Sequence, residues 1–253
     1  MNTITIDIGN SRTKVETWDD DGFMYMDTEG ETCVDKILDL CERRNVKGVA
    51  ISTVKRDSEE FISALKKNSK CPVIVFDEEE IRKYYDLSHY QGHLGPDRMA
   101  AFLGAERLDG KSPKMIVDLG TAMTIDIADN GLFYGGNISL GLYTRLKALA
   151  SSTSMLPELT ELENYRLFGT DTVSAIESGA MNGILGEILY SAECAKSKIG
   201  IELTYLTGGD SEEVYIKIKN QLKCFYDPHL VGRGLDYHIR KFYLHAPIGG
   251  IHI

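Results

Sequence analysis

The same order of strand-like and helix-like segments occurs twice in this chain, once in each half. In the first half, the apolar spacing predicts three strands within the first 26 residues, a helix over 34–44, a strand over 48–54, a helix over 58–65 and a strand over 72–76. In the second half, it predicts strands over 115–119, 123–128 and 132–138, a long helix over 172–198, a strand over 203–206, a helix over 211–222 and a last strand over 223–226. Such a repeat predicts two α/β lobes of like topology with a cleft between them.

The repeat also suggests a domain division. We expect one lobe over residues 1–110 and a second over 111–253, with no Gly- or Pro-rich linker between them. Residues 78–109 have no evident counterpart in the second half, and this segment contains the sequence Gly-Pro-Asp-Arg at 95–98.

Composition excludes several classes of protein. The 253 residues include 38 acidic and 28 basic side chains, a formal charge of -10, which argues against a protein that coats nucleic acid or an anionic membrane. No apolar stretch approaches the ~20 residues of a membrane helix, and no signal peptide is written at the N-terminus. The five cysteines form no C-x-x-C pair, which favours reduced thiols and a cytoplasmic location.

Common catalytic motifs are missing. We find no G-x-x-x-x-G-K-[ST] loop, no G-x-G-x-x-G after a strand, no H-E-x-x-H and no G-x-S-x-G. His89 and His93 are four residues apart, but no third ligand is evident, so surface histidines are the preferred interpretation.

Each half instead carries a carboxylate at the end of its first strand, followed by glycine and small hydroxylated residues. The two turns read Asp-Ile-Gly-Asn-Ser at 7–11 and Asp-Leu-Gly-Thr-Ala at 118–122. Glycine lets successive backbone N–H groups approach an anion, and the aspartate can hold a cation that balances phosphate charge. Arg12 and Lys14 add positive charge beside the first turn. One D-x-G sequence could simply close a hairpin, but two matched copies indicate a phosphate clamp.

Five motifs together resemble the type III pantothenate kinase family, which lies within the acetate and sugar kinase, heat-shock chaperone and actin superfamily. They are DIGNSRTK at 7–14, GPDR at 95–98, DLGTAMT at 118–124, GGNISLG at 135–141 and TGGD at 207–210, in the family's order and over essentially the whole chain. One departure is Leu140, where the family pattern usually has proline.

The resemblance implies a fold and an activity. The fold would be two duplicated ribonuclease H-like (actin-like ATPase) lobes, each a mixed five-stranded sheet with helices, with the nucleotide in the cleft. The activity would be ATP-dependent phosphorylation of pantothenate to 4'-phosphopantothenate, the first step of coenzyme A biosynthesis. It also implies Mg²⁺ with the ATP, a monovalent cation (K⁺ or NH₄⁺) and a homodimer.

The resemblance assigns roles to particular residues. Asp97 matches the proposed base, and Asp118 matches the ligand of the monovalent cation. The positions that match ATP-binding residues are Asp7, Ile8, Gly9, Asn10, Ser11, Arg12, Thr13, Lys14 and Thr121. The positions that match pantothenate-binding residues are Tyr90, Gly95, Pro96, Asp97, Arg98 and Thr172.

Other interpretations stay open. Asp97 could cap the helix that follows it, and Arg98 could be a solvated charge at a helix end. Tyr90 could simply pack at the rim of the site. Residues 208–210 could form an ordinary strand-to-helix turn or contact adenosine. A different small-molecule kinase, or a nonenzymatic transcription accessory factor on the same fold, is the alternative function.

Overall fold

Two five-stranded sheets with the same strand order form the framework of the chain. The computed structural model describes residues 1–20, 23–26, 33–163 and 165–245, so the apolar tail at 246–253 and most of the predicted turn at 20–22 lie outside the described residues. The two sheets have the orders β3-β2-β1-β4-β5 and β10-β9-β6-β7-β8. Each strand of the first sheet thus has a counterpart at the same place in the second, as the repeat in the sequence predicts.

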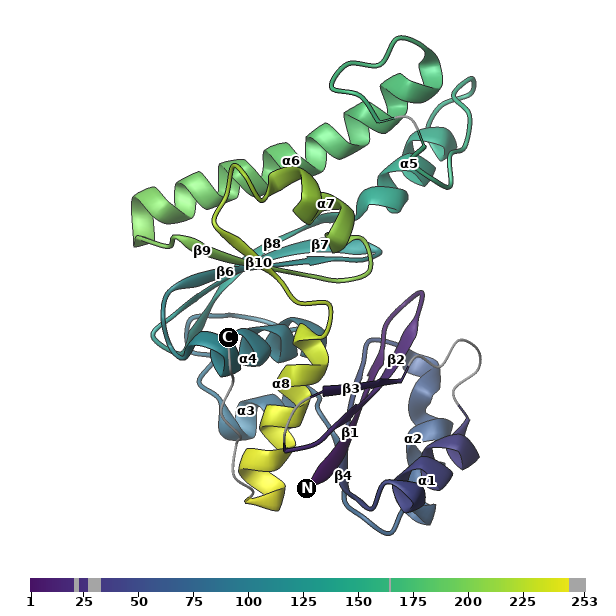
Figure 1. Ribbon diagram of the computed structural model, residues 1–253, viewed down its shortest axis with the longest axis vertical. Coiled ribbons are helices and arrows are strands. Elements are labelled where there is room, and N and C mark those ends of the chain that lie inside the picture. Colours follow the sequence, from purple (N-terminus) through teal and green to yellow (C-terminus); the bar gives the residue numbers. More distant parts are fainter. Residues whose placement is uncertain (21–22, 27–32, 164, 246–253) are drawn as a thin grey trace. The chain divides into compact units, whose positions relative to one another are not determined.

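The first sheet contains β1 (Asn2–Ile8), β2 (Thr13–Trp18), β3 (Phe23–Met26), β4 (Val46–Thr53) and β5 (Val73–Val75). β1, β2 and β3 are antiparallel neighbours, and β1, β4 and β5 are parallel. The helix α1 (Val34–Arg43) leads from β3 into β4, and the short 3-10 turn η1 (Arg56–Ser58) and the helix α2 (Glu59–Asn68) connect β4 with β5. Figure 1 shows α1 and α2 on one side of this sheet and α8 (Leu230–Ile239) on the other.

Both faces of β1 are buried, which the alternation of its sequence does not predict. Ile4, Ile6 and Ile8 pack into an apolar core with Ile37 and Leu40 of α1. Thr3 and Thr5, on the opposite face, are also buried, because α8 covers them. The Thr3 hydroxyl is hydrogen bonded to Asp236 of α8, and the Trp18 indole donates to the Thr5 hydroxyl at 2.8 Å. A polar strand face therefore points into a hydrogen-bonded layer and not into water.

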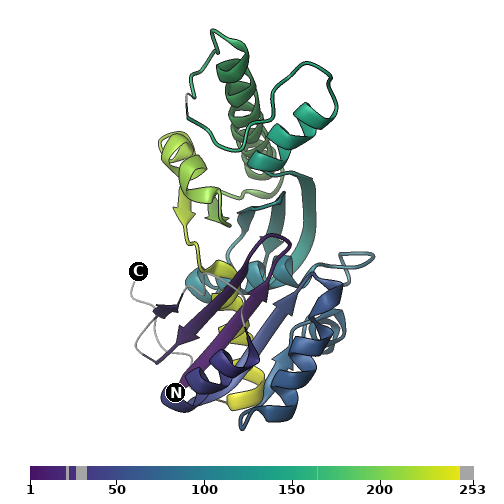
Figure 2. The same ribbon diagram turned by 90° about the vertical axis from the view of Figure 1, so that its right-hand side faces the viewer.

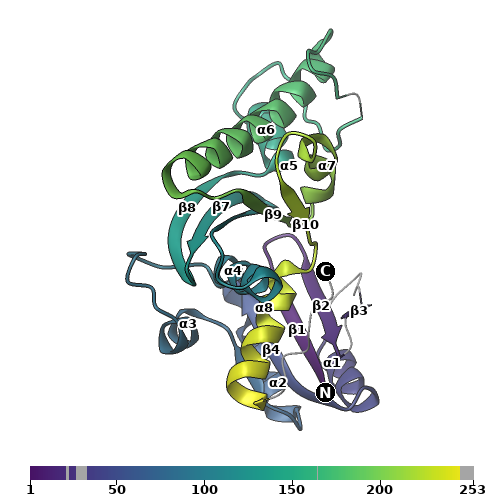
Figure 3. The ribbon, with the colours of Figure 1, turned by 60° about the vertical axis from the view of Figure 1, so that its left-hand side comes forward.

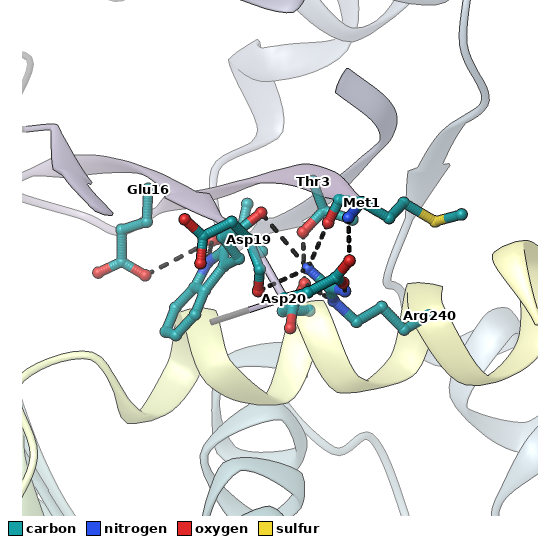
Figure 4. A network of polar contacts seen from close by, with 9 residues as sticks. Met1, Thr3, Glu16, Asp19, Asp20 and Arg240 are labelled. Carbon is teal, nitrogen blue, oxygen red and sulfur yellow. Dashed lines mark hydrogen bonds and ion pairs between the residues drawn. The ribbon is translucent and has the colours of Figure 1, made fainter. Parts of the chain in front are cut away.

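Arg240 is the centre of that layer (Figure 4). It opens the π-helical turn η2 (Arg240–Leu244), and its side chain is only 3% exposed. Its Nε donates to Asp236 at 2.7 Å and its Nη1 to Asp20 at 2.8 Å. Its Nη2 lies 2.9–3.3 Å from three backbone carbonyl oxygens, those of Met1, Trp18 and Asp19. The guanidinium thereby ties the end of α8 to the first two strands.

The helix α4 (Pro96–Asp109) lies beside α8, as Figure 3 shows. The helices cross closely at two glycines: a Cβ on Gly104 would lie 2.0 Å from the carbonyl oxygen of Leu230, and one on Gly234 would lie 1.8 Å from that of Ala100. The short helix α3 (Glu78–Tyr84) precedes α4. In chain order α4 comes after β5, the last strand of the first sheet, and α8 comes after β10, the last strand of the second. The part of the segment 78–109 that forms α4 therefore has a counterpart in α8.

The second sheet contains β6 (Lys114–Leu119), β7 (Ala122–Asp129), β8 (Leu132–Leu140), β9 (Leu203–Thr207) and β10 (Cys224–Tyr226). Three helices accompany it: α5 (Leu142–Ser151), α6 (Thr172–Ile199) and α7 (Ser211–Ile218). Figure 2 shows α5 and α6 next to each other at the same end of this unit. Ile184 and Ile188 of α6 pack with Val117 and Leu206 of the sheet in one apolar core.

The chain divides into two units, Met1–Gly110 together with the residues from Leu230 onward, and Lys111–His229. The sequence predicts that all of 111–253 belongs to the second lobe, and here the structure differs, because α8 packs on β1 and β4 of the first sheet. The reason is chemical: Asp236 is hydrogen bonded to Thr3 of β1, and Arg240 donates to the backbone carbonyls of Met1, Trp18 and Asp19 beside it. Among the described residues, no helix is long and apolar enough to cross a membrane.

Candidate active site

The first turn, at residues 7–14, lies where β1 passes into β2. Asp7 is the second-last residue of β1 and lies directly opposite Lys14 on β2, with Ser52 of β4 on its other side. The N–H of Gly9 donates to the carbonyl of Arg12 at 3.0 Å, which closes the turn tightly. Asn10, Ser11 and Arg12 are exposed at its tip, Thr13 and Lys14 are half-buried, and Ile8 is buried in the core. The turn therefore presents a carboxylate, an ammonium and several polar groups at one edge of the sheet.

The second turn, at residues 118–122, occupies the equivalent place in the second sheet. Asp118 is the second-last residue of β6 and lies between Thr124 of β7 and Thr207 of β9. Gly120 donates its N–H to the carbonyl of Ala122 at 3.0 Å, and Thr121 is exposed at the tip. The repeat noticed in the sequence is thus also a repeat in strand register, with each aspartate on the central strand of its sheet.

The segment at 207–210 packs directly on this second turn. Gly208 has φ +95°, and a Cβ there would lie 2.4 Å from Oδ1 of Asp118 and 2.3 Å from the carbonyl oxygen of Leu119. The N–H of Asp210 donates to the same Leu119 carbonyl at 3.0 Å. This position requires glycine on two grounds, its backbone conformation and the close approach to Asp118. The strand-to-helix turn therefore holds Asp118 in place.

Leu140 ends β8 immediately before the N-terminus of α5. Its side chain is 47% exposed, and its carbonyl accepts a 2.8 Å hydrogen bond from Nε of Arg145. The same guanidinium donates to Glu187 of α6 at 2.8 Å. The N–H of Gly141 donates to the carbonyl of Thr121 at 3.1 Å. Arg145, which the sequence analysis does not single out, fixes the turn that carries leucine in place of the family proline.

The GPDR segment forms the start of α4. Gly95 is the N-cap and Pro96, which is buried, is the first helical residue, so Asp97 is the second residue of the helix and not its cap. Its Oδ1 accepts the N–H of Arg98 at 2.9 Å. Burial raises the pKa of Asp97, although the hydrogen bond from Arg98 and the charge of that residue act in the opposite direction. A half-buried carboxylate with a raised pKa at a helix start has properties suited to proton transfer.

Arg98 is buried, so its interpretation as a solvated charge at a helix end is wrong. Its Nη1 donates to the hydroxyl of Tyr90 at 3.0 Å, and its guanidinium carbon lies 5.5 Å from the centre of the Tyr90 ring. Tyr90 is half-buried. Tyr90, Asp97 and Arg98 thus form one group within the first unit.

Thr172 is the first residue of α6 and is exposed. It follows Asp171, whose side chain accepts the N–H of Ser174 at 2.9 Å in a capping box. Thr172, Asp118 and Thr121 belong to the second unit, whereas Asp7, Tyr90 and Asp97 belong to the first.

Among the described residues, no group of three or more His, Cys, Asp or Glu side chains could enclose a metal ion on its own. His93 contacts Glu78 through its Nδ1. A magnesium ion in phosphoryl transfer requires only one or two carboxylates, since substrate phosphates and water complete its coordination. Asp7, a half-buried carboxylate at the mouth of the first turn, fits that requirement.

Comparison with known proteins points to one family. A family model of type III pantothenate kinase matches residues 3–193. The type III pantothenate kinase of Bacteroides fragilis strain YCH46 is 34% identical over 238 residues, which cover 93% of this chain and 96% of the relative. That of Azobacteroides pseudotrichonymphae genomovar. CFP2 is 37% identical over 199 residues, which cover 78% and 75%.

Solved structures show the same fold. A Baf family protein from Campylobacter jejuni, whose given name is that of a transcriptional activator, superposes with a TM-score of 0.60 at 24% identity, covering 94% of this chain and 98% of that one. The ROK hexokinase from Thermus thermophilus superposes with a TM-score of 0.53 at 11% identity, covering 94% and 98%. These likenesses establish the actin-like ATPase fold that the sequence predicts. The match to the family model and to its curated relatives goes further: this chain is an enzyme of the type III pantothenate kinase family, a kinase for which the family implies ATP with a divalent metal ion.

Proposed function

We propose that this protein transfers the γ-phosphoryl group of ATP to the primary hydroxyl of pantothenate, which yields 4'-phosphopantothenate and ADP and begins coenzyme A biosynthesis. The observation that carries this proposal is the group of Tyr90, Asp97 and Arg98 at the start of α4. It combines a desolvated carboxylate, which can accept a proton, with a buried guanidinium, which can bind the carboxylate of the substrate.

Asp97 is the proposed base. In the reaction the hydroxyl proton of pantothenate moves to the Asp97 carboxylate, a bond forms between that oxygen and the γ-phosphorus, and the bond from the γ-phosphorus to the β-phosphate oxygen breaks, so that ADP leaves. A carboxyl group with an ordinary pKa near ~4 would be a weak base. Because burial raises the pKa of Asp97, its carboxylate accepts the proton more readily.

Each unit contributes a turn to ATP binding in this proposal. In the first unit, the backbone N–H groups of 10–12 and the side chains of Asn10, Ser11 and Arg12 bind phosphate oxygens, and Lys14 adds positive charge. Asp7 would hold the magnesium ion, which neutralises charge on the transferring phosphoryl group when bound. In the second unit, Thr121 contacts phosphate and Asp118 provides one hard oxygen ligand for K⁺ or NH₄⁺. Tyr90, Gly95, Pro96, Arg98 and Thr172 surround pantothenate.

A homodimer is also part of the proposal. The second unit exposes several large apolar side chains, among them Ile138 (64%), Leu167 (63%), Phe168 (79%) and Tyr190 (70%). Exposed apolar side chains mark an interaction site where they gather in one patch, so these residues are candidates for the interface. We propose a cytoplasmic location, which is supported by the five cysteines, all present as free thiols.

The test is an ADP-release assay with a panel of hydroxylated acceptors, which should include pantothenate, pantetheine, a hexose and N-acetylmannosamine. Release of ADP with pantothenate alone, together with phosphopantothenate identified by mass spectrometry, supports the proposal. Turnover with another acceptor would assign the alternative small-molecule kinase. ATP binding without turnover of any acceptor would favour the nonenzymatic transcription accessory factor.

A further inference from the structure

Two of the five cysteines lie on neighbouring segments of the first unit. Cys41 is in the last turn of α1, and Cys71 lies between the end of α2 and β5. The residues beside them are joined across the same gap, because Nζ of Lys70 forms an ion pair with Glu42. α1 and α2 also pack against each other. The backbone therefore brings the two cysteines together although 29 residues separate them.

The two thiols are in contact with each other. Both are half-buried and pack against the apolar core that contains Ile37 and Leu65. A hydrogen bond joins the side chains of Cys41 and Cys71. On its other side, Sγ of Cys71 lies 3.4 Å from the hydroxyl of Ser69, and Lys47 is near enough for its charge to act on it. Two sulfur atoms in contact, one of them beside a hydroxyl donor and a cation, form an arrangement suited to disulfide formation.

The surroundings make the two thiols unequal. The hydrogen bond from Cys41, and to a smaller extent Ser69 and the charge of Lys47, lower the pKa of Cys71 to about 6, although burial acts in the opposite direction. The same hydrogen bond, together with burial, raises the pKa of Cys41. Because Ser69 and Lys47 lie beside Cys71, Cys71 is the thiol of the pair that ionises more readily.

We propose that Cys41 and Cys71 are a peroxide-reactive thiol pair that closes reversibly to an intramolecular disulfide, with Cys71 as the attacking thiolate and Cys41 as the resolving thiol. This proposal does not depend on the proposed kinase reaction, because neither cysteine belongs to the candidate active site.

The chemistry balances with hydrogen peroxide as the oxidant. The Cys71 thiolate attacks one peroxide oxygen, the O–O bond breaks, and Cys71 becomes a sulfenic acid while hydroxide leaves. The Cys41 sulfur then attacks the Cys71 sulfur, the S–S bond forms, and the S–O bond breaks. The departing oxygen leaves as water with the proton of Cys41. Two thiols lose two electrons in total, and one peroxide is reduced to two waters.

The experiment treats the folded, fully reduced protein with a small excess of hydrogen peroxide, blocks the remaining thiols and digests it with trypsin without reduction. We expect one linked pair of peptides, residues 37–43 and 71–82, that dithiothreitol separates again. Brief alkylation with iodoacetamide over a range of pH, analysed by mass spectrometry, should modify Cys71 with a midpoint near pH 6.

Three variants separate the roles. Cys41→Ser should stop at the sulfenic acid, which dimedone traps on Cys71. Cys71→Ser should leave Cys41 reduced at the same dose. Cys224→Ser, a control at another half-buried cysteine, should form the linked peptides as the wild type does. The proposal is overturned if the linked peptides are absent, if they form only after denaturation in urea, or if Cys71→Ser oxidises Cys41 at the wild-type rate.

Discussion

Gly95 lies so close to the carboxylate of Asp97 that a Cβ on Gly95 would be 2.6 Å from Oδ1. No real Cβ contact is this short, so Gly95→Ala must displace the carboxylate from its position at the start of α4. Because proton transfer depends on the placement of the base, we expect kcat for pantothenate phosphorylation to fall by about 10²-fold while the Kd of ATP stays constant. Steady-state kinetics and nucleotide titration measure the two quantities.

Gly179 provides the matched control for that substitution. It lies inside α6, and a Cβ there would meet nothing within 4 Å. Gly179→Ala should leave kcat unchanged and raise the melting temperature slightly, since alanine is the better helix former. If Gly95→Ala also keeps its kcat, the position of Asp97 is irrelevant to the reaction.

Asp97→Asn should separate activity from stability. The asparagine oxygen can still accept the Arg98 N–H, but it cannot accept the substrate proton, so kcat should fall by about 10²–10⁴-fold. The pKa of Asp97 is raised in the folded protein, so the folded state binds this proton more tightly than the unfolded state. Stability from this group is therefore lost as pH rises through the raised folded pKa, and at neutral pH the ionised carboxylate is destabilising. We expect Asp97→Asn to melt at a higher temperature than the wild type at pH 7.

Thermal melts at pH 4 and pH 7 test whether ionisation of Asp97 destabilises the folded protein. The difference in melting temperature between Asp97→Asn and the wild type should shrink at the lower pH, where more of the wild-type carboxyl is protonated. If Asp97→Asn keeps the full kcat, the role of Asp97 is purely structural. A lower melting temperature at pH 7 would show that the charge stabilises the start of α4.

Arg240→Met should be among the most destabilising substitutions in the first unit. It leaves Asp236, a buried carboxylate whose pKa desolvation already raises, without its guanidinium partner, and it removes the donor to three backbone carbonyls. Breaking such a buried pair costs about 3–5 kcal/mol of unfolding free energy, measured by urea titration. The exposed pair of Arg43 and Asp39 gives the contrast, because Arg43→Met should cost below about 1 kcal/mol. Equal losses for the two variants would contradict a central role for Arg240.

Asp118 should determine the response to monovalent cations. A large, weakly hydrated cation suits one carboxylate and backbone carbonyls, so activity should rise with potassium or ammonium and much less with sodium. Asp118→Asn should abolish that response, whereas Asp126→Asn, on the neighbouring strand β7, should keep it. Rates measured in potassium, ammonium and sodium buffers at constant ionic strength test this. Equal wild-type rates in sodium and potassium would rule out the assignment.

The strand pattern and the turns could be predicted from the sequence because both depend on local residues. The repeat of 115–119 after 3–8, for example, predicts two equivalent sheets, and the structure has the same strand order in both. The sequence predicts a helix start near Asp97 but does not fix its first residue. Asp97 would be the cap if the helix began one residue later, but the helix begins at Pro96 and Gly95 is the cap.

What could not be predicted depends on partners distant in the chain. Thr3 and Thr5 look like the solvent side of a strand until α8 places Asp236 over them. Arg98 looks solvated until Tyr90 accepts its hydrogen bond. The start of α8 is strongly apolar and rich in glycine, and no strand pairing or cap signal marks it, so the sequence does not separate residues 230–239 from the second lobe.

The arrangement of Thr172 and Asp97 leads to a prediction about the dimer. Thr172 begins α6 in the second unit, and Asp97 begins α4 in the first. We propose that the Thr172 of one subunit contacts the pantothenate bound mainly by the other subunit. Thr172→Ala and Asp97→Asn should then each be nearly inactive as pure dimers, because every site lacks one of the two residues.

Mixing the two variants tests this directly. In a heterodimer, one site receives both substituted residues and the other receives both intact residues, so random exchange should restore about a quarter of the wild-type activity per subunit, by the closed symmetry of a twofold dimer. Subunit exchange is verified independently with two differently tagged variants. Mixing Thr172→Ala with an unrelated inactive protein gives the baseline. If exchange is complete and activity does not recover, each site is built within one chain, and Thr172 acts on the pantothenate bound by its own subunit.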